Sequence, residues 1–529
     1  MSEGNRSSQF PSTTVRSVLA SRGLTVADVS RLSRAAFPAD KRFHVPPNLC
    51  HLLERKQFAP SLQQIFALSR FSRYRIADWL AVFGLDLNEI PRLQMVLPTR
   101  LTTLIDGSLI DQQEPMLRFE SIASGAFPAS LHPLSERVEL STSRPGQPDS
   151  PGPTEACLYA KIGSHDAFAF PDLLPGSIVR VRRLERFAVD EIPTGRGGAL
   201  FLIEHANGLA CSRLHALAHG RVVLSPTCLP FAQVELDLEK QARILGAVEF
   251  ELRPMRASLN ASVLPSLHRF WTPPPLADTS RALPLGVLLA RARQRAGLTF
   301  REASAKSSLI ARACQNWKCH CASGALSDYE SHGAAPRHAW KMLSLCVLYS
   351  LNPWEFMAAS GLDLGEAGTE AIPEELANRA SSVSERGRDN RFSEKSLLAE
   401  LPYFFGQAAA EYFKMPRLSL RDLFSVGNST RSFHPYLAEA AVLIIDRRQK
   451  QIASLGQVPL WAQPLYVLIR RNGQFLCASC VPEEGQSLTL RPFSDGIDRP
   501  LRLKIPAEVE VVGRVVGILR RLLPQAAPR

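Results

Sequence analysis

The chain has 529 residues, of which 45% are hydrophobic, and its 62 Lys and Arg outnumber its 50 Asp and Glu to give a net charge of +12. At about 100–200 residues per domain, this length predicts roughly three to five domains. No stretch reaches the roughly 18 uninterrupted apolar residues of a membrane helix. The polar start, Met1 to Thr14, lacks the apolar core of a secretion signal. Composition therefore argues against a membrane protein and against a secreted one.

Two further features of the composition bear on compartment and partner. The ten cysteines are scattered and do not follow the spacing of a disulfide framework, which fits a reducing cytoplasm. The basic charge balance favours an anionic partner such as nucleic acid.

A long internal repeat organises the sequence. Four landmarks of the first half return in the same order in the second half at nearly one offset, 274 to 277 residues. This period is far too long for a solenoid and indicates a duplicated multi-domain segment. The paired landmarks are Gly23-Leu24-Thr25 with Gly297-Leu298-Thr299, Glu54 with Glu330, Pro60 with Pro336, and Gly84-Leu85-Asp86-Leu87 with Gly361-Leu362-Asp363-Leu364.

Segments with the composition of linkers separate the parts of each copy. They are residues 142–154, rich in Ser, Pro and Gly, residues 252–282, with a run of three prolines, and residues 365–396, which are polar and charged. We therefore expect a multidomain α+β chain in which two all-α bundles alternate with two β-rich domains. The predicted domains are residues 14–90 and 283–364, which are helical, and residues 155–252 and 397–524, which are rich in short strands.

The helical segments carry clear helix-start signals. Thr25 followed by Asp28 is a capping-box pattern, and Thr299 followed by Glu302 repeats it in the second copy. Apolar residues recur at helical spacing around these positions. We expect about five short helices in each helical segment.

A series of motifs runs through the second helical segment. It consists of Leu298-Thr299-Phe300-Arg301-Glu302-Ala303-Ser304, then Ala325-Leu326-Ser327-Asp328-Tyr329-Glu330, then Pro336 and Asn352-Pro353-Trp354-Glu355. The series resembles the Cro-repressor (XRE-type) helix-turn-helix family. The resemblance implies that the helices ending at Glu330 and at Glu54 are recognition helices for the major groove of DNA.

Each copy departs from that family in the same way. The family has about 20 residues between the Leu of its Leu-Thr start and the final Glu of the recognition helix. Here 30 residues separate Leu24 from Glu54, and 32 separate Leu298 from Glu330. Each copy thus carries an insertion of about ten residues before its recognition helix.

The basic residues lie in these insertions, because residues 47–54 and 323–330 contain no Lys or Arg. Phosphate contacts are therefore expected from the insertions, and base contacts from polar residues of the recognition helices. The candidate DNA-binding residues are Lys41, Arg42, His44, Asn48 and His51 in the first copy, and Arg312, Lys318, Ser323 and Ser327 in the second. The alternative is a helical bundle that kept the fold and lost strong DNA affinity.

The strand-rich segments contain the same succession of short apolar runs. Turn residues separate the runs, so we expect a compact β-rich fold of short strands in each copy. The runs are residues 177–181, 200–203, 209–211, 222–224 and 244–248 in the first copy, and residues 442–445, 466–469, 475–477, 487–490 and 511–517 in the second.

A Pro-centred pattern precedes these runs. The first copy has Pro171 followed by the turn Pro175-Gly176, and the second has Ser432-Phe433-His434-Pro435. This pattern resembles the LexA-like serine peptidase domain of self-cleaving repressors. The family implies a Ser nucleophile three residues before a Pro and a Lys general base held in a strand. Burial lowers the pKa of such a Lys, so its free amine can take the Ser proton.

The resemblance leaves neither copy with both members of that dyad. Phe168 stands at the nucleophile position and Ser212 at the base position of the first copy. The second copy keeps Ser432 but has Ala478 at the base position. A rescue by His434 is disfavoured, because its side chain lies two positions away. We therefore expect a pseudopeptidase without catalytic residues in both copies.

One Cys/His cluster stands out. Its members Cys314, Cys319, His320, Cys321 and His332 lack the Cys-x-x-Cys knuckle of most metal sites, and the first copy has no matching cluster. Free, partly buried thiols are favoured over a metal site. We expect no cofactor and no metal.

Together these features favour sequence-specific binding of double-stranded DNA in transcriptional regulation, without catalysis and in the cytoplasm. The repeat makes a covalent pseudo-dimer possible within one chain. Two alternatives stay open: a protein-interaction scaffold that has lost DNA binding, and an autoproteolytic repressor, which needs a base that the sequence does not supply.

Overall fold

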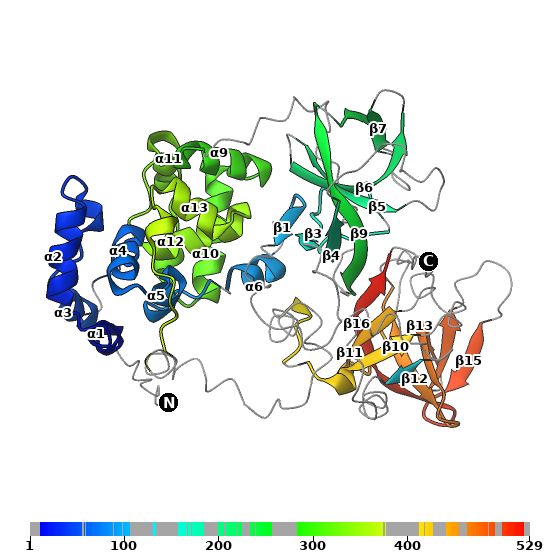
Figure 1. Ribbon diagram of the computed structural model, residues 1–529. Helices are drawn as coiled ribbons and strands as arrows, with labels where there is room; N and C mark the ends of the chain where they lie inside the picture. Colours follow the sequence, from blue (N-terminus) through cyan, green and yellow to red (C-terminus); the bar gives the residue numbers. More distant parts are fainter. Residues whose placement is uncertain are drawn as a thin grey trace, which may run out of the picture. The chain divides into compact units, whose positions relative to one another are not determined.

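A computed structural model shows that the chain combines helices with a large antiparallel sheet, so the fold class is α+β (Figure 1). By internal contacts the chain divides into two compact units. The helical unit comprises Met1–Gln94 and Asp278–Glu394, and the strand-rich unit comprises Met95–Ala277 and Lys395–Arg529. The residues described are 11–55, 58, 60–87, 89–97, 99–105, 131–133, 157–166, 168–170, 172–184, 199–205, 208–217, 220–224, 233–238, 240–255, 283–373, 376, 412–416, 418–426, 441–453, 463–484, 486–491 and 500–522.

The helical unit contains the same succession of elements twice. The first copy has α1 (Pro11–Ala20), α2 (Val26–Ala36), the 3₁₀ turn η1 (Lys41–Phe43), α3 (Leu49–Glu54), α4 (Leu62–Ser72) and α5 (Ile76–Val82), and α6 (Glu89–Val96) follows. The second copy has α9 (Leu285–Arg295), α10 (Phe300–Ala313), the 3₁₀ turn η3 (Trp317–Cys319), α11 (Ser323–His332), α12 (Ala339–Tyr349), α13 (Pro353–Ala359) and the 3₁₀ turn η4 (Leu364–Glu366). The five helices expected in each helical segment are therefore present.

Both capping boxes are also formed. The Thr25 hydroxyl accepts from the Asp28 amide at 3.2 Å, and Thr299 accepts from the Glu302 amide at the same distance. The carboxylates of Asp28 and Glu302 accept in return from the backbone of the capping threonines. These bonds satisfy amides that the first turn of a helix leaves without intrahelical partners, which is why α2 and α10 begin where they do.

The segment that follows the second bundle packs on the first bundle. Residues 367–372 run beside the end of α4: the Gly368 amide donates to Ser69 at 3.0 Å, and the Ile372 amide donates to Asp78 at 2.9 Å. Arg70 pairs with Glu366, and Arg22 pairs with Glu370. Residues 365–373 therefore belong to the helical unit, although their polar composition predicted a linker.

The segment that follows the first bundle makes the reciprocal contact. On α6, Gln94 is 4% exposed and its side-chain amide donates to the Cys346 carbonyl of α12 at 3.3 Å. The first bundle thus receives the C-terminal extension of the second, and the second receives that of the first. This exchange joins the two copies into one helical unit.

The strand-rich unit likewise contains one series of strands twice. The first copy has β1 (Thr103–Ile105), β3 (Cys157–Lys161), β4 (Ile178–Arg183), β5 (Leu200–His205), β6 (Gly208–Ala216), β7 (Arg221–Leu224), β8 (Val234–Asp237) and β9 (Ala242–Pro254). The second has the 3₁₀ turn η7 (Leu420–Asp422), β10 (Leu423–Val426), β11 (Ala441–Asp446), β12 (Tyr466–Arg470), β13 (Phe475–Glu483), β14 (Ser487–Arg491), β15 (Leu501–Lys504) and β16 (Val509–Arg521), and β2 (His132–Pro133) pairs with β10. Nine of the ten apolar runs expected as strands lie within these strands, and the tenth, residues 177–181, begins one residue before β4. Residues 252–254, predicted as the start of a linker, complete β9.

The strand order shows the duplication directly. It reads β15-β14-β13-β12-β16-β9-β5-β6-β7-β8, so each strand on one side of the β16–β9 junction has its counterpart at the same distance on the other side. The register irregularities recur as well: between Arg180 and Val181 on β4 and between Ile444 and Ile445 on β11. The two halves of the sheet are therefore related by an approximate two-fold axis through the junction.

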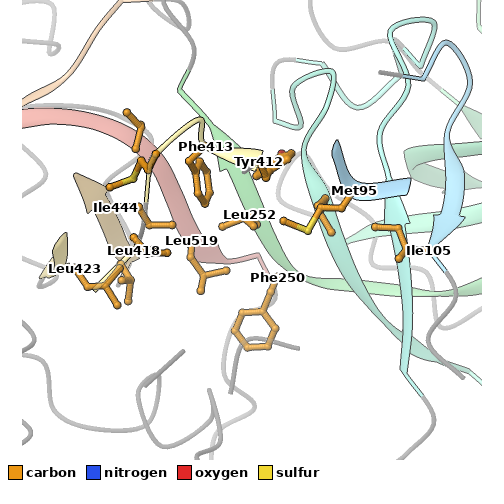
Figure 2. Packing of buried hydrophobic residues seen from close by; sticks show 14 residues of the cluster. Met95, Ile105, Phe250, Leu252, Tyr412, Phe413, Leu418, Leu423, Ile444 and Leu519 are labelled. Atoms are coloured by element: carbon orange, nitrogen blue, oxygen red, sulfur yellow. The ribbon is translucent and has the colours of Figure 1, made fainter. Parts of the chain in front are cut away.

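The junction is an antiparallel pairing of β9 with β16. Leu252 stands opposite Leu519, its counterpart 267 residues later, which places this pair on the two-fold axis. Beyond the paired residues, the Met255 amide donates to Val516 and the Leu522 amide donates to Glu249. An apolar cluster covers the junction, and Figure 2 shows Phe250, Leu252, Phe413, Ile444 and Leu519 within it.

A buried ionic cluster lies in the same place. Glu251 and Arg253 are both fully buried, and their Oε1 and Nε atoms are 3.1 Å apart. Arg520 reaches the other oxygen of Glu251 across the junction, with Nε 2.8 Å from Oε2. The position of β16 that corresponds to Glu251 is Ile518, so two symmetry-related arginines share one carboxylate. Burial opposes the charge on Glu251, yet the two guanidinium groups hold its pKa below the ordinary value.

Two equivalent glycines permit the bends of the long junction strands. A Cβ at Gly246 of β9 would collide with the Arg182 carbonyl, and a Cβ at Gly513 of β16 would lie 2.7 Å from the Asp446 carbonyl. Arg182 and Asp446 occupy matching places on β4 and β11. The absence of a side chain at these two positions therefore lets each junction strand pass from one neighbouring strand to the other.

The N-terminal part of the strand-rich unit supplies an edge strand to each half of the sheet. In the first half β1 pairs with β3, and Thr102 bridges to Leu209 of β6. In the second half β2 pairs with β10, and Leu131 bridges to Phe475 of β13. Residues 102–105 and 131–133 thus hold equivalent places, although both come from the first half of the chain. The described helices include none with the length and hydropathy needed to cross a membrane.

We predict that Glu251→Ala lowers the free energy of unfolding of the strand-rich unit by about 3–5 kcal/mol. The reason is that two guanidinium groups would stay buried without their common counter-charge. Urea unfolding followed by the strand signal in circular dichroism measures the loss.

The matched control for this change is Glu235→Ala. Glu235 pairs with Arg221 at 3.3 Å on the surface of β7 and β8, with both side chains about half exposed. This pair should contribute no more than about 1 kcal/mol. Equal losses in the two variants would show that the buried cluster does not hold the junction together.

Candidate nucleic-acid interface

The predicted recognition helix of the second copy, α11, is fixed to α9 by two contacts. Arg293 on α9 binds Glu330 on α11 through both ends of its guanidinium group, at 2.8 and 3.0 Å. Gly286 lets the two helices approach closely, because a Cβ there would collide with the Glu330 carbonyl. The Glu at the end of the motif is therefore an anchor, and α11 presents its opposite face to solvent. In the first copy Arg16 and Glu54 form the corresponding pair at 3.1 Å.

The insertions predicted before the recognition helices have one structure in both copies. Each forms a 3₁₀ turn capped by a side chain: Asp40 accepts from the Arg42 amide, and Asn316 accepts from the Lys318 amide, each at 3.0 Å. Each turn leads to a backbone amide that donates to a serine of the preceding helix. These bonds are Val45 to Ser33 at 3.1 Å and Cys321 to Ser307 at 2.9 Å. The insertions are thus built parts of the fold.

The candidate residues of the first copy lie along the turn η1 and the helix α3. Lys41, Asn48 and His51 are exposed to solvent. Arg42 is engaged by Asp40, with Nη2 2.6 Å from Oδ2, and this bond lowers the pKa of the Asp40 carboxyl. His44 is half-buried, with Nε2 2.8 Å from the Phe37 carbonyl. Lys41 has no ion pair with any residue that the structure describes, so it carries the unneutralised positive charge of η1.

The candidate residues of the second copy surround the start of α11. Arg312 is exposed near the end of α10, and Lys318 is exposed on η3, with its ammonium 5.6 Å from the centre of the Trp340 ring. Ser323 is exposed at the first position of α11, and Ser327, four residues later, lies on the same face and is half-buried. The structure brings these residues to one end of the helix pair.

A feature that sequence reasoning missed lies beside them. Thr299, Phe300 and Arg301 at the start of α10 and Ser323 and Gly324 at the start of α11 line a shallow depression of about 550 Å³. The first turn of α10 already carries the Glu302 carboxylate, whereas the start of α11 has no side-chain cap. The N-terminus of α11 therefore favours an anion in this depression, and the exposed Arg301 adds a cation. The capping box at Thr299 marks the start of α10. The start of α11 lies beside the start of α10 only because of the way the insertion folds, which the sequence pattern does not reveal.

Three of the four positions that the resemblance assigns to a peptidase dyad lie among the described residues, and all three are buried. Phe168 is fully buried and packs in a cluster with Phe201 and Leu214. Ser212 is fully buried, and its hydroxyl donates to the Arg213 carbonyl at 2.7 Å. Ala478 is equally buried.

The strand register supports the equivalence of the two base positions. Ser212 stands opposite Phe201 on β5, and Ala478 stands opposite Tyr466 on β12, at matching places in the two halves of the sheet. Pro171, Ser432 and His434 lie outside the described residues. Neither Ser212 nor Ala478 has a side chain that can act as a base at neutral pH.

A buried carboxylate lies next to the nucleophile position of the first copy. Asp166 accepts from the Thr102 hydroxyl at 2.6 Å and from the Cys211 amide at 2.9 Å. Burial raises the pKa of Asp166 to about 6, although both hydrogen bonds favour the charged form. The bond to Thr102 also helps to hold residues 102–105 against the sheet.

The Cys/His cluster consists of free thiols in the second bundle. Cys319 and Cys321 are buried, Cys314 is half-buried, and burial raises the pKa of Cys321 to about 12. A hydrogen bond with Cys319 lowers the pKa of Cys314. The His320 ring forms a hydrogen bond with the Ser307 hydroxyl, with 3.0 Å between Nδ1 and Oγ. Within the described part of the chain, no three His, Cys, Asp or Glu side chains gather closely enough to hold a metal ion.

Comparison with protein-family models, with curated proteins and with solved structures found no match to this chain.

We predict that the purified protein stays full length during long incubation, including at alkaline pH, which deprotonates lysines. The reason is that Ser212 and Ala478 offer no general base. Intact-mass spectrometry and gel electrophoresis over several days test this. A discrete pair of fragments that disappears in Ser432→Ala would contradict it, because it would identify Ser432 as a working nucleophile.

We also predict that Asp166 makes stability depend on pH. Its pKa in the folded state is about 6, above the ordinary value of 3.8, so folding is favoured while the group is protonated. This contribution is fully present below pH 4 and is lost as pH rises through 6. Between pH 4 and 7, the stability of Asp166→Asn relative to the unsubstituted protein should therefore rise by about 2 kcal/mol.

Asp446→Asn is the control for this pH series. The hydrogen bond that Arg448 donates lowers the pKa of Asp446, so Asp446 titrates below pH 4. Its substitution should therefore have the same effect at every pH of the series. Urea unfolding at pH 4, 5, 6 and 7 gives both series. Parallel curves for Asp166→Asn and the unsubstituted protein would rule out a titrating buried Asp166.

Proposed function

We propose that this chain is a non-catalytic DNA-binding transcriptional regulator of the repressor type that acts in the cytoplasm as a covalent pseudo-dimer. The observation that carries the proposal is the geometry at the start of α11. Ser323 and Gly324 are exposed there, and the depression that they share with the start of α10 is suited to a phosphate group. A helix-turn-helix protein needs both features, since it reads bases with one helix and holds the backbone with the other.

The charges around this end of the bundle support the same function. Arg301, Arg312 and Lys318 are exposed, and Lys41 is exposed at the corresponding turn of the first copy. DNA affinity comes largely from cations that neutralise phosphates, and base edges are read by polar side chains. The candidate base-reading residues differ between the copies: Asn48 and His51 in one, Ser323 and Ser327 in the other. The preferred site should therefore be an imperfect palindrome.

The arrangement of the repeat supports a pseudo-dimer. Repressors of the family that this chain resembles place two recognition helices in successive major grooves, roughly 34 Å apart. Here both helical segments share one unit, and the strand-rich segments pair about Leu252 and Leu519. Tethering makes such a pairing intramolecular, with an effective concentration that reaches the millimolar range for suitable linkers. A single chain then has the two helical and two strand-rich segments that two subunits supply in a dimeric repressor.

Two observations fit the remaining parts of the proposal. The described cysteines are free thiols, which suits a reducing compartment. Phe168 has no nucleophilic atom, and neither the buried Ser212 nor Ala478 can act as a base at neutral pH. The strand-rich unit then serves assembly, through the β9–β16 junction.

We predict that the affinity for duplex DNA falls steeply with salt and that Lys41→Ala, Arg312→Ala and Lys318→Ala together flatten this dependence. Each phosphate contact contributes about 0.9 to the slope of log K against log salt, so loss of three contacts should reduce the slope by roughly 2–3. Arg42→Ala should change it little, because Asp40 already neutralises Arg42. Fluorescence anisotropy with a labelled 30-base-pair duplex of randomised sequence measures the slope.

The control variant removes Lys240, Arg471 and Lys504, three exposed cations of the strand-rich unit, and thus changes the net charge equally. An equal effect of this variant would place the DNA contacts elsewhere. No binding at any salt concentration would contradict the proposed function and favour the scaffold alternative. Light scattering of the complex gives the stoichiometry, which should be one 58.3 kDa chain per duplex.

A further inference from the structure

One large apolar side chain of the helical unit is exposed to an unusual degree. Trp317, the first residue of η3, is 65% exposed, whereas the other exposed large hydrophobic side chains in the described part of the chain reach at most 42%. An indole offers a large apolar face with one polar group, so in folded proteins it is mostly buried or held at an interface. This exposure therefore indicates a binding role.

The backbone that carries Trp317 is rigidly held. Asn316 caps the turn, and the Ser344 hydroxyl donates to the Cys319 carbonyl at 2.6 Å. The Trp317 ring lies 4.7 Å from the His320 ring, at an angle of 32°. His320 is in turn held in place by a hydrogen bond with Ser307 of α10. Since the ring is already ordered, a ligand that stacks on it loses little conformational entropy.

The surroundings of Trp317 are cationic. Residues 303–327 contain no Asp or Glu, and the exposed Arg312 and Lys318 lie in this stretch. Glu89 of α6, whose charge acts on the nearby Cys314, is already paired with Arg92. An aromatic face beside exposed cations matches the chemistry of nucleic acids, in which bases stack and phosphates carry the charge. The same turn of the first copy begins with Lys41, so the two insertions differ at this point.

We infer that Trp317 stacks on a nucleobase of bound duplex DNA, next to the groove that α11 enters, while Lys318 and Arg312 contact the flanking phosphates. The inference rests on the proposed function and names a contact that the helix-turn-helix arrangement does not require. Aromatic side chains that enter a base step partially unstack it and kink the duplex. The second copy would then deform its half of the site, and the first copy, with Lys41, would not.

The test compares Trp317→Ala, Trp317→Phe and Leu309→Ala, using the labelled duplex of randomised sequence described above. Leu309 is an exposed apolar residue of α10 and serves as the control. Trp317→Ala should weaken binding about 10-fold or more, Trp317→Phe much less, and Leu309→Ala hardly at all. The salt slope should stay unchanged in Trp317→Ala, since no charge is removed, while Lys318→Ala should flatten it.

A second measurement tests the same contact by fluorescence and does not depend on a change in affinity. Titration of the unsubstituted protein with unlabelled duplex should quench tryptophan emission, and most of that quenching should be missing in Trp317→Phe. Unchanged affinity of Trp317→Ala, or equal quenching in Trp317→Phe, would overturn the inference. The proposed function would still stand in that case, provided that the unsubstituted protein binds DNA. If the unsubstituted protein does not bind DNA, both fail together.

Discussion

The antiparallel pairing of β9 with β16 is the contact on which the strand-rich unit depends. It joins the two halves of the sheet into one structure and sets the two-fold axis at Leu252 and Leu519. The apolar cluster of Figure 2 covers it, and Gly517 leaves room for the ring of Phe413. The single carboxylate of Glu251 between Arg253 and Arg520 shows how the copies have diverged, because a symmetric junction would have two such carboxylates. A buried ionic cluster of this kind is costly to break, because loss of one partner leaves the others buried without a counter-charge.

The helical unit is held together in a different way, by an exchange of C-terminal extensions. Residues 367–372 pair with the backbone at Tyr74 and Arg75, and Gly368 allows this approach because a Cβ there would collide with the backbone of Arg73. In the other direction α6 contacts α12 through Gln94. Each bundle therefore completes its packing with chain from the other copy. For this reason we regard the duplicated chain as one working molecule with two non-identical halves.

This non-identity runs through every part of the candidate interface. The insertions share a capped 3₁₀ turn and a serine anchor, yet one presents Lys41 and the other Trp317. The pairs that fix the predicted recognition helices also differ: Arg293 and Glu330 are mostly buried, while Arg16 and Glu54 are exposed. Since a buried pair positions its helix more firmly than an exposed one, α11 has the better-defined orientation. The proposed regulator would accordingly read two unlike half-sites.

Sequence alone determined the repeat, the five short helices of each bundle with their capping boxes and ten of the sixteen described strands, because these depend on residues close together in the chain. Thr25 with Asp28, and the alternating apolar runs, are local patterns with local causes. Sequence also identified Ser212 and Ala478 as equivalent positions, which the strand register supports. Only the tertiary structure decided which distant residues meet: Glu251 with Arg520, Glu366 with Arg70, and the start of α10 with that of α11. It also decided that residues 365–373 pack on the first bundle and that Trp317 stays exposed. Such contacts join residues far apart in the chain, and no local pattern encodes them.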